Sequence, residues 1–185
     1  MIDRLSETID AVDITVLSGF LGSGKTTLIR TLLERPDLER TAVIINEFGE
    51  IGLDHELIES SEEDLVELST GCICCVMRGD LQEAIERLMV RQQTGKVFDR
   101  IILETTGLAD PGPILHSLIY NEYLKSLVRL DRVVITVDAL SGLNSIANFK
   151  ECPQQIALAD IILITKADID STNVDDLRRE LRRIN

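Results

Sequence analysis

The chain of 185 residues is long enough for one α/β domain with a sizeable core, and short for two. Hydrophobic residues make up 44% of it and aromatic residues only 3%, so the core must consist mainly of Ile, Leu and Val. The formal net charge of −13 argues against non-specific binding to nucleic acid or to anionic membranes.

An apolar, β-rich run at residues 13–18 leads into a glycine-rich turn, and the turn opens a helix with apolar residues at helical spacing. The turn has the pattern G-x-x-x-x-G-K-[ST], with a strand before it and a helix after it. Such a loop points its backbone N–H groups at an anion, and the helix start adds unpaired donors. We therefore predict a phosphate-binding loop in which Lys25 reaches the β- and γ-phosphates and Thr26 binds Mg²⁺. The residues assigned to nucleotide binding here are Gly19, Gly22, Ser23, Gly24, Lys25, Thr26 and Thr27.

Apolar runs that predict strands alternate with helical patterns along the rest of the chain. The predicted strands are residues 43–45, 65–68, 98–103, 133–137 and 161–164, and helices are predicted at Asp80, Asp110-Pro111, 153–160 and 173–184. The helix at Asp80 should bury a face made of Leu81, Ala84, Ile85, Leu88 and Met89. Because the strands do not alternate polar with apolar residues, they should be covered on both faces. This predicts an α/β, three-layer P-loop NTPase fold with a mostly parallel sheet and helices on both faces.

Polar motifs follow the ends of several predicted strands, and parallel sheets bind ligands at that edge. In Glu104-x-x-Gly107 the carboxylate can hold Mg²⁺, directly or through water, and the glycine can offer its N–H to the γ-phosphate. Glu47 lies where a segment that senses the γ-phosphate would lie, and we count it as a ligand of Mg²⁺ or Zn²⁺. We assign catalysis to Lys25, Glu104 and Gly107, with no general base identified.

The last predicted strand is followed by Thr165-Lys166-Ala167-Asp168. The carboxylate of Asp168 can accept two hydrogen bonds from guanine, a pair of donors that adenine does not offer. The aliphatic part of Lys166 can lie against the base. We therefore assign nucleotide binding to Thr165, Lys166 and Asp168, with GTP preferred over ATP. Asp138 ends another strand, and the sequence gives it no role.

Three cysteines lie within four residues, as Cys72, Cys74 and Cys75, while Cys152 stands alone. In a chain expected to be cytosolic, this cluster indicates a metal or redox site and not a disulfide framework. We expect residues 71–75 to form a loop whose three sulfurs bind Zn²⁺ or a similar thiophilic ion. Three sulfurs leave one coordination position open, which suits a site that hands its metal on. A redox pair is the alternative.

Together these motifs resemble the CobW-type GTPases, relatives of the nickel-insertion GTPases of hydrogenase and urease maturation. The matching segments are Gly-Phe-Leu-Gly-Ser-Gly-Lys-Thr-Thr (19–27), Asn-Glu-Phe-Gly-Glu-Ile-Gly-Leu-Asp (46–54), Gly-Cys-Ile-Cys-Cys (71–75), Glu-Thr-Thr-Gly-Leu-Ala-Asp-Pro (104–111) and Thr-Lys-Ala-Asp (165–168). They occur in the family's order and cover nearly the whole chain. The chain departs from the family at Thr165, where Asn is usual, and we expect neither the family's C-terminal domain nor its His-rich stretch within residues 1–185.

The resemblance implies a GTP-dependent metallochaperone that hydrolyses GTP slowly and passes its metal to a client metalloprotein. Zn²⁺ is the metal most often assigned to the family, and Co²⁺ is assigned to members that act in cobalamin synthesis. Related GTPases often dimerise across the nucleotide, so a homodimer is one expected state. Two other functions stay open: a P-loop kinase that phosphorylates a small molecule, and a metal-buffering module indifferent to nucleotide.

The expected location and domain boundaries rest on the hydropathy of the chain and on the segments at its two ends. No apolar stretch is long enough to span a bilayer, and residues 1–10 are polar and acidic, unlike a secretory signal. We therefore expect a cytoplasmic protein. The chain stops directly after a predicted helix, where an α/β fold usually adds another strand. We interpret residues 1–185 as one GTPase domain truncated at its C-terminal end.

Overall fold

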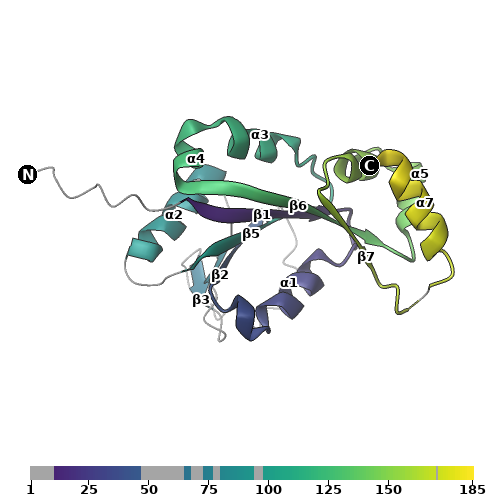
Figure 1. Ribbon diagram of the computed structural model, residues 1–185, viewed down its shortest axis with the longest axis horizontal. Helices are drawn as coiled ribbons and strands as arrows, with labels where there is room; N and C mark the ends of the chain where they lie inside the picture. The colour runs from purple at the N-terminus through teal and green to yellow at the C-terminus, as the bar shows by residue number, and fades with distance from the viewer. Residues whose placement is uncertain (1–10, 47–64, 68–72, 77–79, 94–97, 170) are drawn as a thin grey trace, which may run out of the picture.

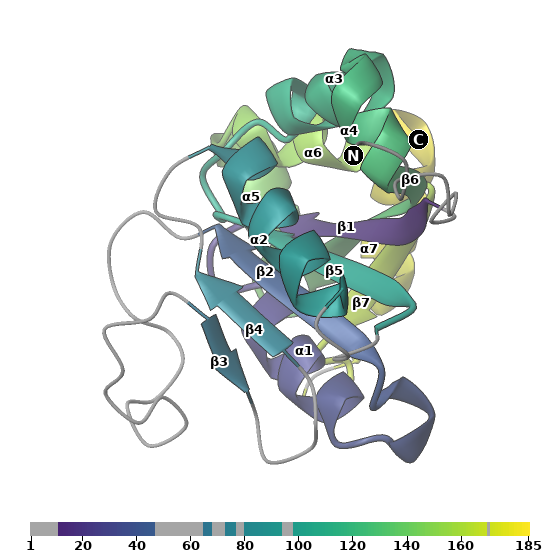
Figure 2. The ribbon, with the colours of Figure 1, turned by 90° about the vertical axis from the view of Figure 1, so that its left-hand side faces the viewer.

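The computed structural model describes residues 11–46, 65–67, 73–76, 80–93, 98–169 and 171–185, with the backbone alone for 46, 65–67 and 73–76. Within these residues seven strands form one sheet (Figures 1 and 2). The strands are β1 (Val12–Gly19), β2 (Thr41–Asn46), β3 (Leu65–Glu67), β4 (Ile73–Val76), β5 (Arg100–Thr105), β6 (Val128–Asp138) and β7 (Ile161–Thr165). Their order is β3-β4-β2-β5-β1-β6-β7, and every neighbouring pair is parallel except β3 and β4. The predicted mostly parallel sheet is confirmed.

Helices cover both faces of the sheet, as predicted. They are α1 (Lys25–Leu33), the 3-10 helix η1 (Pro36–Leu38), α2 (Leu81–Gln93), α3 (Gly112–Tyr120), α4 (Glu122–Leu127), α5 (Gly142–Asn148), α6 (Glu151–Ala157) and α7 (Val174–Ile184). Figure 1 shows α3 and α4 above the sheet and α1 below it. In the described part of the chain, each helix is too short or too polar to cross a membrane.

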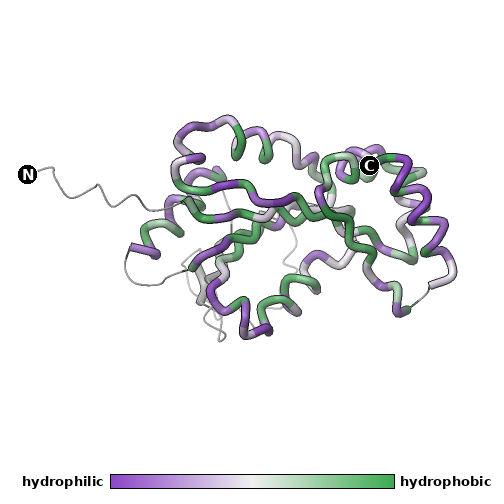
Figure 3. The backbone as a smooth tube through the Cα atoms, in the orientation of Figure 1, coloured by the Kyte–Doolittle hydropathy of each residue, from purple (hydrophilic) through white to green (hydrophobic). Residues whose placement is uncertain are grey.

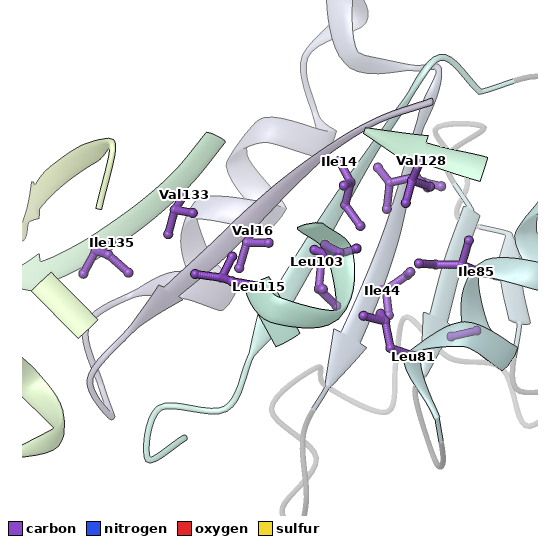
Figure 4. Close-up of a cluster of buried hydrophobic side chains, with 14 of the residues drawn as sticks. Ile14, Val16, Ile44, Leu81, Ile85, Leu103, Leu115, Val128, Val133 and Ile135 are labelled. Carbon is purple, nitrogen blue, oxygen red and sulfur yellow. The ribbon is translucent and has the colours of Figure 1, made fainter. Parts of the chain in front are cut away.

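The core has two parts because successive residues of each central strand point to opposite faces. Val16 belongs to the large cluster beneath α2, α3, α4, α6 and α7, whereas its neighbour Leu17 belongs to a smaller cluster beneath α1. Figure 4 shows the large cluster, with Ile44 and Leu103 of neighbouring strands packed together. Both faces of these strands are therefore buried, and Figure 3 shows hydrophobic stretches in green along the sheet, interrupted by hydrophilic residues.

The face predicted for the helix at Asp80 is confirmed: the buried residues of α2 are Leu81, Ala84, Ile85, Leu88 and Met89. The carboxylate of Asp80 accepts a hydrogen bond from the Gln82 N–H over 3.2 Å, as a residue at a helix start does. The helix predicted at Asp110-Pro111 is α3, which begins at Gly112 with Pro111 as its cap. Three short helices, η1, α4 and α5, were not predicted from the sequence.

Strand β6 begins at Val128, five residues before the predicted strand. Its register with β1 shifts between Ile14 and Thr15, whose partners are Leu130 and Arg132, so Asp131 is an extra residue in a bulge. The charged pair Asp131 and Arg132 interrupts the apolar pattern, although the backbone continues as a strand.

The loop predicted over residues 71–75 is wrong for its last three residues. Ile73, Cys74 and Cys75 belong to β4, which pairs with β2 on one side and β3 on the other. This four-residue strand depends on pairing with β2, where the partner of Cys75 is the distant residue Ile44, and the local pattern around the cysteines does not reveal that contact.

Candidate nucleotide-binding site

The phosphate loop joins β1, which ends at Gly19, to α1, which begins at Lys25. Gly24 occupies the cap position of α1 with φ at +87°, a conformation that glycine adopts without strain. The buried Ser23 hydroxyl lies 2.6 Å from the hydroxyl of Thr136 on β6, so this side chain ties the loop to the sheet. Thr27 and Gly22 are exposed. The predicted strand, turn and helix are thus present in that order.

Lys25 lies inside the loop and not in solvent. Its side chain is only 6% exposed, and its ammonium donates to the carbonyls of Gly19 at 2.9 Å and Phe20 at 3.3 Å. A buried ammonium needs oxygen partners to offset the loss of hydration. The oxygens of a bound phosphate would supply further acceptors at this position.

A hydroxyl and a carboxylate, the two groups that the sequence assigns to Mg²⁺, meet beside the loop. Thr26 at the start of α1 donates through Oγ1 to Glu104 Oε1 over 3.0 Å. Glu104 ends the run of buried residues in β5 and is itself 1% exposed. Two adjacent ligands in an octahedral Mg²⁺ site, each about 2.0–2.1 Å from the ion, lie about 2.9 Å apart. The two side chains therefore fit the ion in chemistry and in spacing.

Gly107 lies directly against the phosphate loop. A Cβ atom on this residue would lie 2.7 Å from the backbone N and Cα of Leu21 and 3.2 Å from the Lys25 ammonium. Only glycine allows the two loops to approach so closely. The backbone of Gly107 is therefore near the position that a γ-phosphate would take.

The motif after β7 is joined to the other side of the phosphate loop. Thr165 donates through Oγ1 to the Ser23 carbonyl at 2.7 Å, and Lys166 donates through Nζ to the Gly22 carbonyl at 2.8 Å. Lys166 has φ at +57°, which turns the chain sharply after the strand. Asp168, three residues past the strand end at Thr165, is exposed.

Asp138 at the end of β6 holds Lys166 in place. Its Oδ2 lies 2.6 Å from Lys166 Nζ, and its Oδ1 accepts from the Leu140 N–H at 2.7 Å. Burial acts to raise the pKa of Asp138, but the hydrogen bonds from Lys166 and Leu140 outweigh it, so the pKa lies below its ordinary value. The carboxylate is therefore ionised at neutral pH and forms an ion pair with Lys166.

The comparisons with known proteins agree with this geometry. The model of the family "CobW/HypB/UreG, nucleotide-binding domain" matches residues 13–185. The chain belongs to this family. The zinc chaperone YjiA of Escherichia coli is 39% identical over 175 residues, which are 94% of this chain and 55% of that protein. The zinc-regulated GTPase metalloprotein activator 1 of Schizosaccharomyces pombe is 38% identical over 186 residues, 96% of this chain and 44% of that protein.

A solved structure of the same family shows that the fold is shared. The crystal structure of the Zn(II)-bound YjiA GTPase from Escherichia coli matches with a TM-score of 0.76 at 36% identity, over 94% of this chain and 54% of that chain. The predicted P-loop GTPase fold and the predicted family are both confirmed. This chain spans about half the length of these relatives.

The predicted metal ligands of this CobW/HypB/UreG domain are placed only in part. Glu47 and Cys72 lie outside the described residues. Cys75 of β4 is in register with Ile44 of β2, which is in register with Leu103 of β5. Since neighbouring strands lie about 4.8 Å apart, the backbone of Cys75 is about 10 Å from that of Leu103, the residue before Glu104. The described side chains, which exclude those of the cysteine cluster, include no group of three or more metal-ligating residues.

Cys152 is not part of this cluster. It is 3% exposed on α6, where burial raises the pKa of its thiol to about 11. A thiol that stays protonated at neutral pH behaves as an apolar core residue.

Two residues of the family domain that touch the site were missed from the sequence. One is Asp138, the partner of Lys166. The other is Gln155 on α6, whose amide donates to two carbonyls of the loop after β5. A strand-end aspartate offers a weak signal, whereas a glutamine in a helical pattern offers none, because most such residues face solvent.

Proposed function

We propose that this chain binds and hydrolyses GTP with Mg²⁺, binds Zn²⁺ at its cysteine cluster, and passes the metal to a client protein under the control of the nucleotide. The observation that carries the proposal is that the phosphate loop contacts both Glu104-x-x-Gly107 and the motif after β7. Thr26 meets Glu104, Gly107 packs against Leu21, and the motif after β7 is bonded to Ser23 and Gly22. This is the geometry that a nucleoside triphosphate with Mg²⁺ needs.

The phosphates would be bound by the loop of residues 19–27, with Lys25 between them and Mg²⁺ held by Thr26 and Glu104. Bound Mg²⁺ would neutralise the charge that develops on the phosphate oxygens. Gly107 would offer its backbone N–H to the γ-phosphate. Hydrolysis would be slow, because the chain offers no identified general base.

The base would be guanine, read by the exposed Asp168. Thr165 and Lys166 would fix the position of Asp168 through their bonds to the phosphate loop. Thr165 stands where the family usually has Asn, and its hydroxyl supplies a donor to the loop in place of an amide. Binding of a GTP analogue should therefore resist competition by an ATP analogue.

The metal would be bound by Cys72, Cys74 and Cys75, with Glu47 or another residue as a fourth ligand. Zn²⁺ is favoured over Co²⁺ because the similar proteins of Escherichia coli and Schizosaccharomyces pombe are named a zinc chaperone and a zinc-regulated GTPase. A metallochaperone needs a client metalloprotein, and a homodimer is one state in which it could act. We propose the cytoplasm as its location.

Coupling between nucleotide and metal requires that the metal bind with different affinities in the two nucleotide states. The strand that carries Cys74 and Cys75 is two strands away from β5, which ends beside the Mg²⁺ position. Strand β2 pairs with both β4 and β5, so a displacement of β5 at the γ-phosphate would reach the cysteines through β2.

The test is a Zn²⁺ titration against a chromophoric chelator, with Mg²⁺ and a non-hydrolysable GTP analogue, GDP or an ATP analogue. We expect tight Zn²⁺ binding with the GTP analogue alone, and loss of it in Cys72→Ser, Cys74→Ser and Cys75→Ser. Cys152→Ala, which changes a buried cysteine outside the cluster, is the matched control and should bind as the unchanged chain does.

Three results would contradict the proposal. Equal Zn²⁺ affinity with every nucleotide would make the chain a metal-buffering module. Absence of Zn²⁺ binding would remove the chaperone function. Transfer of labelled phosphate from ATP to a small acceptor would indicate a kinase.

A further inference from the structure

A buried amide on α6 holds the loop that follows β5. Gln155 is 1% exposed, and its Nε2 donates to the Gly107 carbonyl at 3.2 Å and to the Ala109 carbonyl at 3.0 Å. Gln155 lies 48 positions from Gly107 and 46 positions from Ala109 in the sequence. One side chain therefore ties the loop that contains Gly107 to a helix outside the loop.

The orientation of this amide is fixed by its neighbours. Nε2 carries two N–H groups, and each has a carbonyl acceptor. Turning the amide over would place Oε1 against the same two carbonyl oxygens, which repel it. Among the described residues Oε1 has no hydrogen-bond partner, so the side chain is oriented by what Nε2 binds.

The apolar side chain at the centre of the loop does little to hold the loop in place. Leu108 is 60% exposed, so the apolar side chain at its centre is not buried. Within the loop the Ala109 N–H bonds to the Thr106 carbonyl and the Leu108 N–H bonds to the Thr106 hydroxyl, each at 3.3 Å. These local bonds shape the turn without fixing it against the phosphate loop.

The helix that carries Gln155 is itself fixed to the sheet and to the phosphate loop. Cys152 and Ile156, on the same helix, are buried in the large core cluster. Phe149, just before the helix, packs against Phe20 of the phosphate loop with ring centroids 4.7 Å apart. The amide of Gln155 therefore sets the position of Gly107 relative to the phosphate loop.

We propose that Gln155 is a positioning residue for the γ-phosphate: it holds Gly107 against the phosphate loop so that the Gly107 backbone can bind the γ-phosphate of GTP. The inference rests on the proposed GTP site. GDP lacks the γ-phosphate and does not use Gly107, so Gln155 acts on the affinity for GTP and leaves that for GDP unchanged. The amide acts through Gly107 and does not touch the nucleotide.

The test compares Gln155→Met with Gln154→Met. Methionine has nearly the length and volume of glutamine but has no N–H donor. Gln154 is the preceding residue of the same helix and is exposed, so its variant carries the same chemical change away from the loop. Affinities for fluorescent GDP and a fluorescent non-hydrolysable GTP analogue are measured with Mg²⁺, and thermal melting checks that each variant is folded.

We expect Gln155→Met to bind the GTP analogue about 30-fold more weakly, the change expected for two hydrogen bonds, with GDP affinity unchanged. Gln154→Met should change neither. Equal weakening of both nucleotides would show a general packing role and overturn the inference, as would no weakening of either. If the unchanged chain binds GDP and the GTP analogue while Gln155→Met has no selective effect, the proposed function survives and the inference fails. If the unchanged chain binds neither, both fail.

A second variant and a second measurement cover the case in which Gln155→Met does not fold. Gln155→Glu keeps the shape of the side chain but directs a carboxylate at the two carbonyls. It should therefore also lower the affinity for the GTP analogue and leave the affinity for GDP unchanged. In that variant, hydrogen exchange of a peptide covering residues 106–109 with the GTP analogue bound should be faster than in the unchanged chain. Unchanged exchange and unchanged affinity would overturn the inference.

Discussion

The two sides of the phosphate loop are held by different kinds of contact. On the base side, Thr165 and Lys166 donate directly to loop carbonyls, and Asp138 pairs with Lys166. These residues lie at or next to the ends of β6 and β7, which are bonded to each other and, through β6, to β1. The sheet itself therefore fixes the base side.

The γ-phosphate side depends on a loop and not on a strand end. Gly107 packs against Leu21, and the loop is tied to α6 through the amide of Gln155. GDP and GTP share the base and differ only in the γ-phosphate. Changes on the base side should therefore affect both nucleotides equally, whereas changes on the γ-phosphate side should affect GTP alone.

The largest effect that tests this comparison is expected for Gly107→Ala. The added Cβ would lie 2.7 Å from the backbone of Leu21, so the loop has to move away from the phosphates. Single-turnover GTP hydrolysis should fall by about 100-fold, the loss typical for one backbone donor to a developing charge. GDP affinity, measured in parallel, should stay the same.

The control for this variant is Gly112→Ala, at the start of α3. There the three atoms nearest to the added Cβ all belong to the side chain of Asp110, with Oδ1 at 3.0 Å, and this exposed side chain can move aside. Its hydrolysis rate should be close to that of the unchanged chain. A loss of GDP affinity in Gly107→Ala as large as its loss of hydrolysis would break the distinction between the two sides.

The next largest effect is expected for Asp138→Asn on the base side. Asparagine keeps an acceptor for the Leu140 N–H but removes the charge that pairs with Lys166. GDP and the GTP analogue should both bind about tenfold more weakly, since a hydrogen bond between charged groups contributes about 1.5–3 kcal/mol. Titration of the fluorescent nucleotides measures both affinities.

Asp131→Asn is the matched control, because Asp131 lies on the same strand and forms only an exposed pair with Arg132 at 3.9 Å. Neither nucleotide should bind it more weakly. If Asp138→Asn lowered the affinity for the GTP analogue and left the affinity for GDP unchanged, the base side would also respond to the γ-phosphate.

The sequence predicted those parts of the site whose chemistry is local. The glycines, Lys25 and Thr26 lie in one turn between a strand and a helix, so their spacing alone identifies a phosphate loop. The strands around this loop were predicted because both of their faces are buried, which leaves continuous apolar runs. The placement of Glu104 beside Thr26 then followed from the rule that ligands bind at the carboxyl edge of a parallel sheet.

The parts that the sequence did not predict depend on contacts between distant segments. The first half of β6 was missed because the charged residues Arg129, Asp131 and Arg132 interrupt its apolar pattern, with Asp131 in a bulge. Asp138 pairs with Lys166, which is 28 positions away in the sequence. Gln155 binds two carbonyls that are 46 and 48 positions away. No local pattern in the sequence marks these contacts. The predicted roles of Glu47 and Cys72 stay predictions, since both residues lie outside the described part of the chain.

The smallest effect is expected for Thr165→Val, which keeps the shape of the side chain and removes its donor to the Ser23 carbonyl. GDP and the GTP analogue should both bind about fivefold more weakly, the loss expected for one hydrogen bond of about 1 kcal/mol. Thr165→Asn, which restores a donor, should recover the affinity for both nucleotides in the same titration. If Thr165→Val weakened GTP alone, the bond to Ser23 would belong to the γ-phosphate side. If it changed neither affinity, the ion pair between Lys166 and Asp138 would hold the base side without the help of Thr165.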